Sequence, residues 1–273
     1  MMTVTIEEAV AREVKEETGQ DVIKCQYVSL CIVNAKGNLI YLNWNEEVNL
    51  TMRIFLCGGG SGEQTTEAIR RFSDLIDHKK PLLYIPLAMK SDLYPSCLEW
   101  IKGEMQGVNI TNIDMVTSTE EIVRKELKDY SAIFIGGGNT FKLLYELKAS
   151  GAFDQMKDYI EQDGIIFGGS AGAIIFGESL ESCALDDENH VGLRDITGFN
   201  VLDGISLLCH YTNRTEEKDR KSTEYLTELS KRRKVIALPE EDTLFVNGNK
   251  VEVIGTRPYY YFENGIREER QAK

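Results

Sequence analysis

The sequence predicts an α/β fold built on a doubly wound, mostly parallel sheet. Two observations lead to this prediction. Strand-like and helix-like segments alternate from residue 52 onward, and several strand-like segments, such as 82–87, are continuous apolar runs. Such runs are typical of parallel strands, because helices cover both faces of these strands. Ligands bind such sheets beyond the carboxyl ends of the strands, so residues that follow a predicted strand are the first candidates for a site.

The predicted elements follow one another in a regular order. Strands are expected where short apolar runs end at glycines or polar residues, and helices where apolar residues recur at helical spacing. The strands fall at 53–57, 82–87, 108–115, 132–135 and 164–167, and the helices at 63–76, 93–105, 120–127, 141–147 and 153–162. Further strands are predicted at 205–209 and 235–238, followed by a hairpin over 245–251 with an Asn-Gly turn.

The first 51 residues differ from the remainder and are predicted to form a separate segment, 1–51, before the main domain, 52–273. A helix is expected at 6–17, and two strands at 28–34 and 39–42 flank Lys36-Gly37-Asn38. A helix and a hairpin are too small to build an independent core.

Composition narrows the classes of function. The net charge of −13 argues against binding to nucleic acid or to anionic membranes. No apolar run approaches the roughly 20 residues of a membrane-spanning helix, and the acidic N-terminus lacks a signal-peptide pattern. The six cysteines form no C-x-x-C pair and several lie in apolar runs, as expected of reduced thiols. We therefore expect a cytoplasmic protein without nucleic-acid or membrane partners.

The segment Gly168-Gly169-Ser170-Ala171-Gly172 is the strongest functional signal. It lies between two apolar runs, where a strand is expected to pass into a helix. Its glycines fit the G-x-S-x-G pattern of a nucleophile elbow, in which small neighbours allow a sharp turn that exposes the serine hydroxyl. The alternative is a glycine-rich turn with a capping serine.

A nucleophilic serine needs a base, because its hydroxyl is protonated at neutral pH. The chain has three histidines. His78 lies at a polar helix end and His190 in an acidic loop, whereas His210 follows the apolar run 205–209 at a predicted strand end. This position favours His210 as the base of Ser170.

An oxyanion hole needs backbone N–H groups that point to the reacting carbonyl oxygen. Ala171, directly after the serine, is one candidate donor. The glycine-rich loop that contains Gly137, Gly138 and Asn139 also follows a predicted strand, so we expect it to supply a second donor or to contact the substrate. The absence of Gly-Lys-Ser/Thr argues against a phosphate-binding loop.

The residues alone do not identify the acid that would orient the imidazole. Asp186 and Asp187 follow the serine by 16 and 17 residues, and Glu240 and Glu241 follow the predicted strand 235–238. Each of these carboxylates is also compatible with a solvated loop position.

Together these segments resemble peptidase family S51, the peptidase E and cyanophycinase group. The matching residues are 134–141, 168–173, 198–199, 210–213 and 238–240, within a resemblance that covers about 52–273. The resemblance implies a fold similar to class I glutamine amidotransferases and a Ser-His-Asp/Glu triad that cleaves short peptides through an acyl-enzyme. Ser170 and His210 match residue by residue, and no cofactor or metal is implied.

The resemblance leaves two features of the site open. Peptidase E implies an acid at Asp186 or Asp187, and cyanophycinase implies Glu241; we favour Asp187, with Glu241 close behind. An arginine in the helix after the histidine accompanies aspartyl specificity in peptidase E. Ser222 falls near that position, directly after the basic residues Arg220 and Lys221, so the resemblance does not extend to a preference for N-terminal aspartate.

The N-terminal segment resembles a different family. Residues 12–19 match the second half of a Nudix box, and Glu13, Glu16 and Glu17 would share one helix face, as ligands of Mg²⁺ on a nucleoside diphosphate do in that family. The first half of the box is absent, so we expect an inactive remnant, or a natural start at Met52.

The sequence thus favours a serine peptidase with a small peptide as substrate. A non-catalytic binding relative and Nudix-type hydrolysis by the N-terminal segment are the alternatives. A glutaminase is disfavoured, because that relative of the fold carries cysteine where this chain has Ser170.

Overall fold

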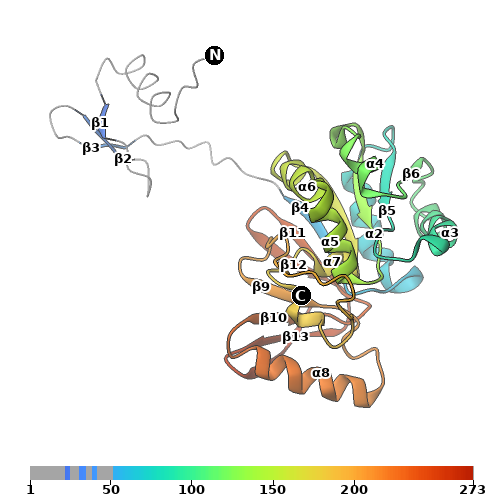
Figure 1. Cartoon of the computed structure of the whole chain (residues 1–273), viewed down its shortest axis with the longest axis vertical. Coiled ribbons are helices and arrows are strands. Elements are labelled where there is room, and N and C mark those ends of the chain that lie inside the picture. Colours follow the sequence, from blue (N-terminus) through green and yellow to red (C-terminus); the bar gives the residue numbers. More distant parts are fainter. Residues whose placement is uncertain (1–21, 25–30, 35–38, 42–51, 273) are drawn as a thin grey trace. The chain divides into compact units, whose positions relative to one another are not determined.

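The strand-like runs between residues 53 and 169 form the parallel centre of a seven-stranded sheet (Figure 1). In this computed structural model the strand order is β12-β11-β4-β8-β7-β5-β6. The parallel strands are β4 (Arg53–Cys57), β8 (Ile165–Gly169), β7 (Ala132–Ile135), β5 (Leu82–Ile85) and β6 (Ile113–Met115). The hairpin of β11 (Thr243–Asn247) and β12 (Lys250–Ile254) adds antiparallel strands at one edge.

Helices cover both faces of this sheet. α2 (Thr66–Leu75) and α3 (Tyr94–Gln106) pack on one face, and α5 (Thr140–Ser150) and α6 (Ala152–Glu161) on the other. Alternate strand residues enter the two cores: Phe55 packs with α2 and α3, whereas Ile54 lies in the core that contains α5 and α6. Two shorter helices, α4 (Thr119–Val123) and α7 (Ala171–Ile174), complete this unit. The predicted doubly wound α/β fold is confirmed.

A second sheet, which the sequence did not predict as such, carries part of the site. Its order is β14-β13-β10-β9, with β9 (Ile205–Leu208), β10 (Lys234–Ala237), β13 (Pro258–Glu263) and β14 (Ile266–Gln271). β9 and β10 are parallel, as their apolar runs suggest, and α8 (Glu216–Leu229) connects them. Apolar patterning identifies such strands but does not specify their partners.

Three predicted elements differ in detail. The strand expected at 108–115 is shortened to β6, because the N–H groups of Val108 and Ile110 both donate to the Met105 carbonyl and extend the end of α3. The helix expected at 120–127 ends at Val123. In the hairpin predicted at 245–251, Asn247 pairs with Lys250, so the turn consists of Gly248 and Asn249 rather than an Asn-Gly pair.

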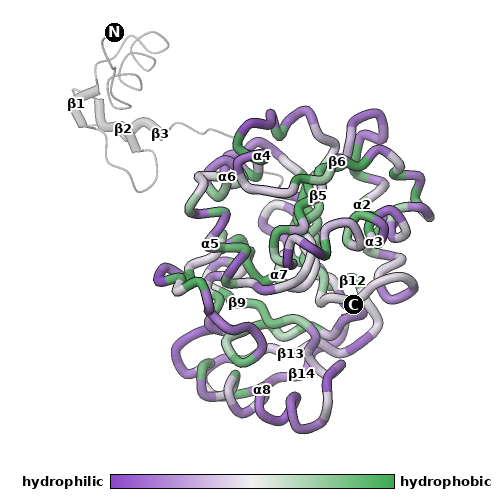
Figure 2. The backbone as a smooth tube through the Cα atoms, turned by 45° about the vertical axis from the view of Figure 1, so that its right-hand side comes forward, coloured by the Kyte–Doolittle hydropathy of each residue, from purple (hydrophilic) through white to green (hydrophobic). Residues whose placement is uncertain are grey.

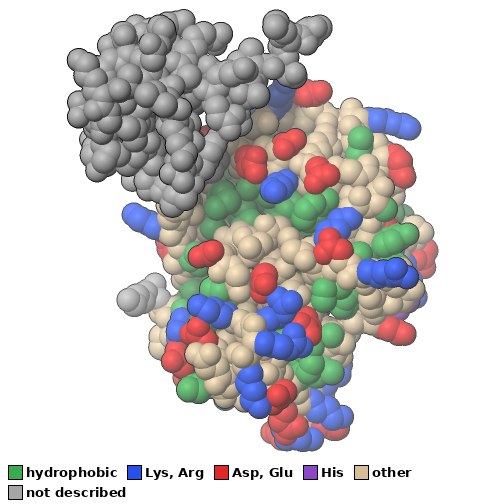
Figure 3. All heavy atoms as spheres, turned by 60° about the vertical axis from the view of Figure 1, so that its left-hand side comes forward, with side chains coloured by type: hydrophobic (Ala, Val, Ile, Leu, Met, Phe, Trp, Pro, Cys, Tyr) green, Lys and Arg blue, Asp and Glu red, His purple; other side chains and the backbone are tan. Residues whose placement is uncertain are grey.

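Surface and core separate as the sequence requires. Hydrophobic residues concentrate along strands such as β5 and β9, whereas α8 is mostly hydrophilic (Figure 2). Acidic and basic side chains are interspersed on the face shown in Figure 3. Among the helices of the described residues, none is both long and apolar enough to cross a membrane.

The structure describes residues 22–24, 31–34, 39–41 and 52–272, and the chain divides into two units, Met1–Asn49 and Leu50–Lys273. In the first unit β1 (Val22–Lys24), β2 (Cys31–Asn34) and β3 (Leu39–Tyr41) form an antiparallel sheet. The last two are the strands predicted around Lys36-Gly37-Asn38. The helix predicted at 6–17 and the Nudix-like residues 12–19 lie outside the described residues.

Candidate active site

Ser170 occupies a sharp turn between β8 and α7. Its φ of 53° and ψ of −115° lie in a region that residues with a side chain rarely adopt, and such strain clusters at functional sites. The neighbouring glycines permit this turn. A Cβ on Gly168 would lie 2.1 Å from the Gly172 carbonyl oxygen, and one on Gly172 would lie 2.3 Å from the Ile135 carbonyl oxygen. The turn therefore requires the small residues that the sequence places there.

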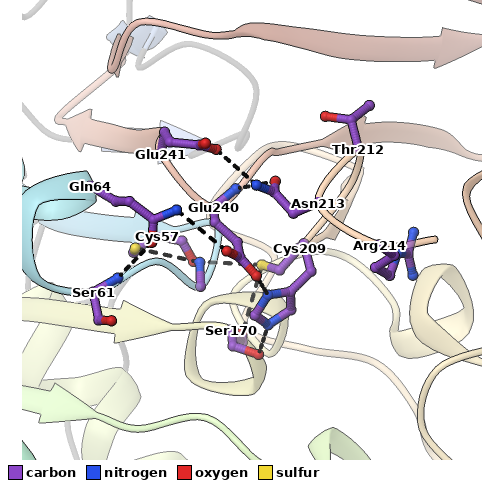
Figure 4. Close-up of polar contacts among 12 residues, drawn as sticks. Cys57, Ser61, Gln64, Ser170, Cys209, Thr212, Asn213, Arg214, Glu240 and Glu241 are labelled. Atoms are coloured by element: carbon purple, nitrogen blue, oxygen red, sulfur yellow. Dashed lines mark hydrogen bonds and ion pairs between the residues drawn. The ribbon is translucent and has the colours of Figure 1, made fainter. Parts of the chain in front are cut away.

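His210 follows β9 of the second sheet and reaches Ser170 across the junction of the two sheets. Its Nε2 lies 2.8 Å from Ser170 Oγ, and its Nδ1 lies 2.8 Å from Glu240 Oε1 (Figure 4). The backbone N–H of His210 donates to the Gly58 carbonyl at 2.8 Å. Serine, imidazole and carboxylate thus form a continuous hydrogen-bonded chain, which is the arrangement of a nucleophile, its base and an orienting acid.

Glu240 is held from several sides. Its backbone N–H donates to Asn213 Oδ1 at 2.8 Å, and its carbonyl accepts from Gly60 N–H at 3.1 Å. The second carboxylate oxygen accepts from Gln64 Nε2 at 3.4 Å. Its side chain is 28% exposed, so the carboxylate is half-buried beside the imidazole.

The structure does not bring the expected acid to His210. Asp187 Oδ2 accepts from the backbone N–H of Thr140 at 2.8 Å and from the Thr140 hydroxyl, at the start of α5. Asp186 pairs with Arg214. Our expectation of Asp187 at the imidazole is therefore corrected to Glu240, because Asp187 serves the first turn of α5 instead, where a carboxylate is stabilised by free N–H groups.

The alternative acid Glu241 also points elsewhere. Glu241 Oε2 accepts from Asn213 Nδ2 at 3.1 Å, and Oε1 pairs with Arg257 Nη1 at 3.1 Å. The sequence offers Glu240 beside Glu241 and does not favour Glu240. The signal available was its position directly after the Leu-Pro pair that ends β10.

The glycine loop after β7 lies beside the serine. A Cβ on Gly137 would lie 3.1 Å from Ser170 Cβ and 3.4 Å from its Oγ, so this backbone approaches the nucleophile closely. Gly138, at a φ of +137°, packs against the Ala88 carbonyl. Asn139 caps α5 by accepting from Lys142 N–H at 2.8 Å, so its side chain oxygen serves the helix. Ala171 is the first residue of α7 and its N–H therefore has no intrahelical acceptor.

A second glycine loop, Gly58-Gly59-Gly60, was predicted only as the end of a strand. A Cβ on Gly59 would lie 2.1 Å from His210 Cε1, and Gly59 has a φ of +112°, so only glycine fits against this face of the imidazole. Gly58 N–H donates to the Asp242 carbonyl at 2.9 Å. The signal that could have revealed it is its position after β4, which matches that of the loop after β7 in the same sheet.

The other two histidines have different surroundings. His78 Nε2 lies 2.9 Å from the Ser73 carbonyl oxygen. His190 is exposed and lies near Glu188, with 3.5 Å between Nδ1 and a carboxylate oxygen. In the part of the chain that the structure describes, no group of three or more His, Cys, Asp or Glu side chains is arranged to hold a metal ion.

A cavity of about 430 Å³ opens beside the serine and the imidazole. Aromatic side chains and small residues of the loops after β4 and β7 line it. The larger lining side chains include Tyr84, Met89, Trp100, Glu104, Phe134 and Phe167. A largely apolar cavity with a few polar groups in its wall is the usual form of a small-molecule site.

Comparisons with known proteins identify a matching family and similar sequences. Residues 54–254 match the profile of Peptidase family S51. Peptidase E of Shewanella amazonensis is 26% identical over 200 residues, which are 71% of this chain and 83% of that protein. Peptidase E of Salmonella paratyphi C is 29% identical over 167 residues, 58% of this chain and 69% of that protein.

Two solved structures share the fold. A Listeria monocytogenes EGD-e protein described as a candidate peptidase E superposes with a TM-score of 0.61 and 24% identity, over 76% of this chain and all of that one. A peptidase from an acI-B1 actinobacterium superposes with a TM-score of 0.62 and 16% identity, over 81% of this chain and 95% of that one.

Proposed function

Because this chain belongs to peptidase family S51, we propose that it is a serine peptidase that cleaves short peptides through Ser170, His210 and Glu240. One observation carries the residue assignment. Ser170 Oγ and Glu240 Oε1 each lie 2.8 Å from opposite nitrogens of the same imidazole. A serine hydroxyl in this arrangement can lose its proton to the imidazole as it attacks a carbonyl carbon.

The reaction proceeds in two stages. In the first, His210 Nε2 takes the hydroxyl proton while Ser170 Oγ bonds to the scissile carbonyl carbon. His210 then gives that proton to the leaving amine, the C–N bond breaks, and an acyl-enzyme remains. In the second, His210 takes a proton from water, the resulting hydroxide attacks the ester, and the proton returns to Ser170. Glu240 accepts from Nδ1–H and stabilises the imidazolium that forms in both stages.

Backbone N–H groups are proposed to bind the oxyanion. Ala171 N–H follows the nucleophile directly, and the close approach of Gly137 to Ser170 supports a second donor from the loop after β7. Gly138 is the alternative donor in the same loop. Asn139 fixes the loop by capping α5.

The other hypotheses have less support. A non-catalytic relative would be favoured by an imidazole without a carboxylate partner, whereas Glu240 accompanies His210 here. Nudix-type hydrolysis rests on residues outside the described part of the chain and stays a prediction. A cytoplasmic location is supported by Cys57, Cys97, Cys183 and Cys209, which are buried free thiols.

Labelling with a fluorophosphonate tests the proposal. Wild-type protein should be modified at Ser170, Ser170→Ala should not react, and His210→Ala should lose most of the labelling because no base remains. Thermal unfolding would verify that each variant is folded. A folded wild-type protein that neither reacts nor cleaves any short peptide would contradict the proposal.

A further inference from the structure

The cavity beside Ser170 has an unusual charge distribution for a peptide site. Apart from the imidazole of His210, Glu104 is the only ionisable side chain with a formal charge at neutral pH among the described residues that line it. Basic side chains occur nearby in the chain but face elsewhere. Arg214 is 11% exposed between Asp186 and Asp219, and Arg220 pairs with Glu224 on the surface of α8. An acidic side chain of a peptide bound in this cavity would therefore lie near the negative charge of Glu104, with no basic side chain to pair with.

Glu104 is held in place with capacity for a further ligand. It projects from α3, and its two carboxylate oxygens accept from one donor, the backbone N–H of Gly62, at 2.9 and 3.1 Å. A carboxylate has about four acceptor positions, so at least two remain. Burial raises the pKa of the Cys57 thiol, and the negative charge of Glu104 makes a smaller contribution in the same direction.

Aromatic rings line the same cavity as this carboxylate, and their faces also attract cations. Trp100 lies one helical turn before Glu104 on α3 and is 40% exposed although it lines the cavity. Its ring packs edge-to-face on Phe134 with 6.0 Å between centroids, which fixes its orientation. The faces of tryptophan and tyrosine rings bind ammonium and guanidinium groups, most strongly where water is excluded.

We propose that this cavity selects peptides that carry a positively charged group on an apolar stem, with Glu104 as the specificity-determining residue. The proposal rests on the proposed peptidase function and adds the substrate class. The cation has two possible sources, the side chain of a lysine or arginine at the scissile carbonyl or the free α-ammonium of the peptide. Both present the same chemistry to Glu104 and Trp100, and acidic side chains are rejected in either case.

The test compares dipeptides that differ only in the first residue: lysine, norleucine and aspartate, each with a free and an acetylated α-amine. Norleucine keeps the stem of lysine and lacks its charge. We expect the cationic member of a matched pair, lysine against norleucine or free against acetylated, to have a kcat/KM at least about tenfold higher, the effect of a hydrogen bond between charged groups. Which pair shows the preference identifies the source of the cation. Aspartyl peptides should be cleaved least.

The variant Glu104→Gln removes the charge and keeps an oxygen that can accept from Gly62 N–H. In this variant the ratio of kcat/KM between the cationic and the neutral peptide of the preferred pair should fall to within about twofold of unity, and the protein should still fold. The matched control is Glu99→Gln on the same helix. Its side chain is 74% exposed and pairs with Lys102, so the ratio should not change. Binding of the same peptides to Ser170→Ala, measured by calorimetry, reports the preference independently of turnover.

Two results would overturn the inference. One is hydrolysis or binding of the aspartyl peptides at least as strong as that of the lysyl and norleucyl peptides. The other is an unchanged ratio in Glu104→Gln for both matched pairs. Failure of the proposed peptidase function is distinguishable, because it would abolish turnover of every peptide together with fluorophosphonate labelling at Ser170, whatever the residue at position 104.

Discussion

Replacement of Glu240 by glutamine tests the part of the site that sequence reasoning did not identify. The glutamine amide can hydrogen-bond to His210 Nδ1 through its oxygen, which keeps the ring in place, or through its NH₂ group, which selects the tautomer with the proton on Nε2. What is lost is the negative charge beside the imidazolium that forms as Ser170 attacks. We therefore expect a fall in kcat/KM with little change in the thermal stability of the protein.

The expected magnitude follows from the contact itself. A hydrogen bond between charged groups contributes about 1.5–3 kcal/mol, and the 2.8 Å between Oε1 and Nδ1 fits such a bond. The side chains of Glu240 and His210 are 28% and 36% exposed, so solvent screening favours the lower half of this range. Loss of the charge alone, about 1.5–2 kcal/mol, lowers kcat/KM about 10- to 30-fold, and selection of the other tautomer would lower it further. Glu240→Ala, which also removes the acceptor, should lose about 100-fold or more.

The assay measures kcat/KM for the best-cleaved peptide and the rate of fluorophosphonate labelling in parallel. Glu241→Gln is the matched control, because the carboxylate of Glu241 contacts Asn213 and Arg257 rather than the imidazole. The kcat/KM of this variant should stay within about threefold of wild type. Asp187→Asn should lower stability by about 1–2 kcal/mol and spare the activity of folded protein. Full activity in Glu240→Gln, combined with a tenfold or greater loss in Asp187→Asn, would refute the assignment.

Three further outcomes are expected. Gly59→Ala would put a methyl group 2.1 Å from His210 Cε1 at a φ of +112°, so it should displace the ring and lower kcat/KM at least about tenfold, which steady-state kinetics would detect. Gly172→Ala would clash with the Ile135 carbonyl at 2.3 Å, and its midpoint of denaturant unfolding should fall by an amount equivalent to at least about 1–3 kcal/mol. Burial raises the pKa of Asp242 to about 6, from 3.8. The folded state therefore holds this proton more tightly, and the contribution of Asp242 to the free energy of unfolding is complete below about pH 4 and falls by up to about 3 kcal/mol as the pH rises through 6. Asp242→Asn should remove this decline, so that melting temperatures of variant and wild type diverge between pH 5 and 7; parallel curves would contradict the burial argument.

The fold could be predicted from the sequence where the pattern is set by burial alone. Strands such as β5 and β7 are covered on both faces, and this produces the continuous apolar runs that identify them. The second sheet could not be predicted in the same way. The runs that become β9 and β10 resemble those of the first sheet, and nothing in a run specifies which strand it will pair with.

The site residues also divide into those that the sequence predicts and those that it does not. Ser170 and His210 could be expected to meet, because both follow strands and the chain offers few histidines. The carboxylate could not be chosen, since four acids lie in two loops and the choice depends on distances of a few ångströms. Glu240 and Glu241 are adjacent in sequence, yet one contacts the imidazole and the other contacts Arg257. Only the packed loops distinguish them.

The glycine loop after β4 explains how residues from two sheets form one site. β4 and β8 are neighbours in the large sheet, so the loop after β4 and the serine after β8 begin side by side. From there the loop bonds at three points to the segments that follow β9 and β10: Gly58 C=O accepts from His210 N–H, Gly58 N–H donates to the Asp242 carbonyl, and Gly60 N–H donates to the Glu240 carbonyl. Through these backbone bonds the loop holds His210 and Glu240 in position relative to Ser170. The separation of the three proposed catalytic groups therefore depends on this loop as well as on the two sheets.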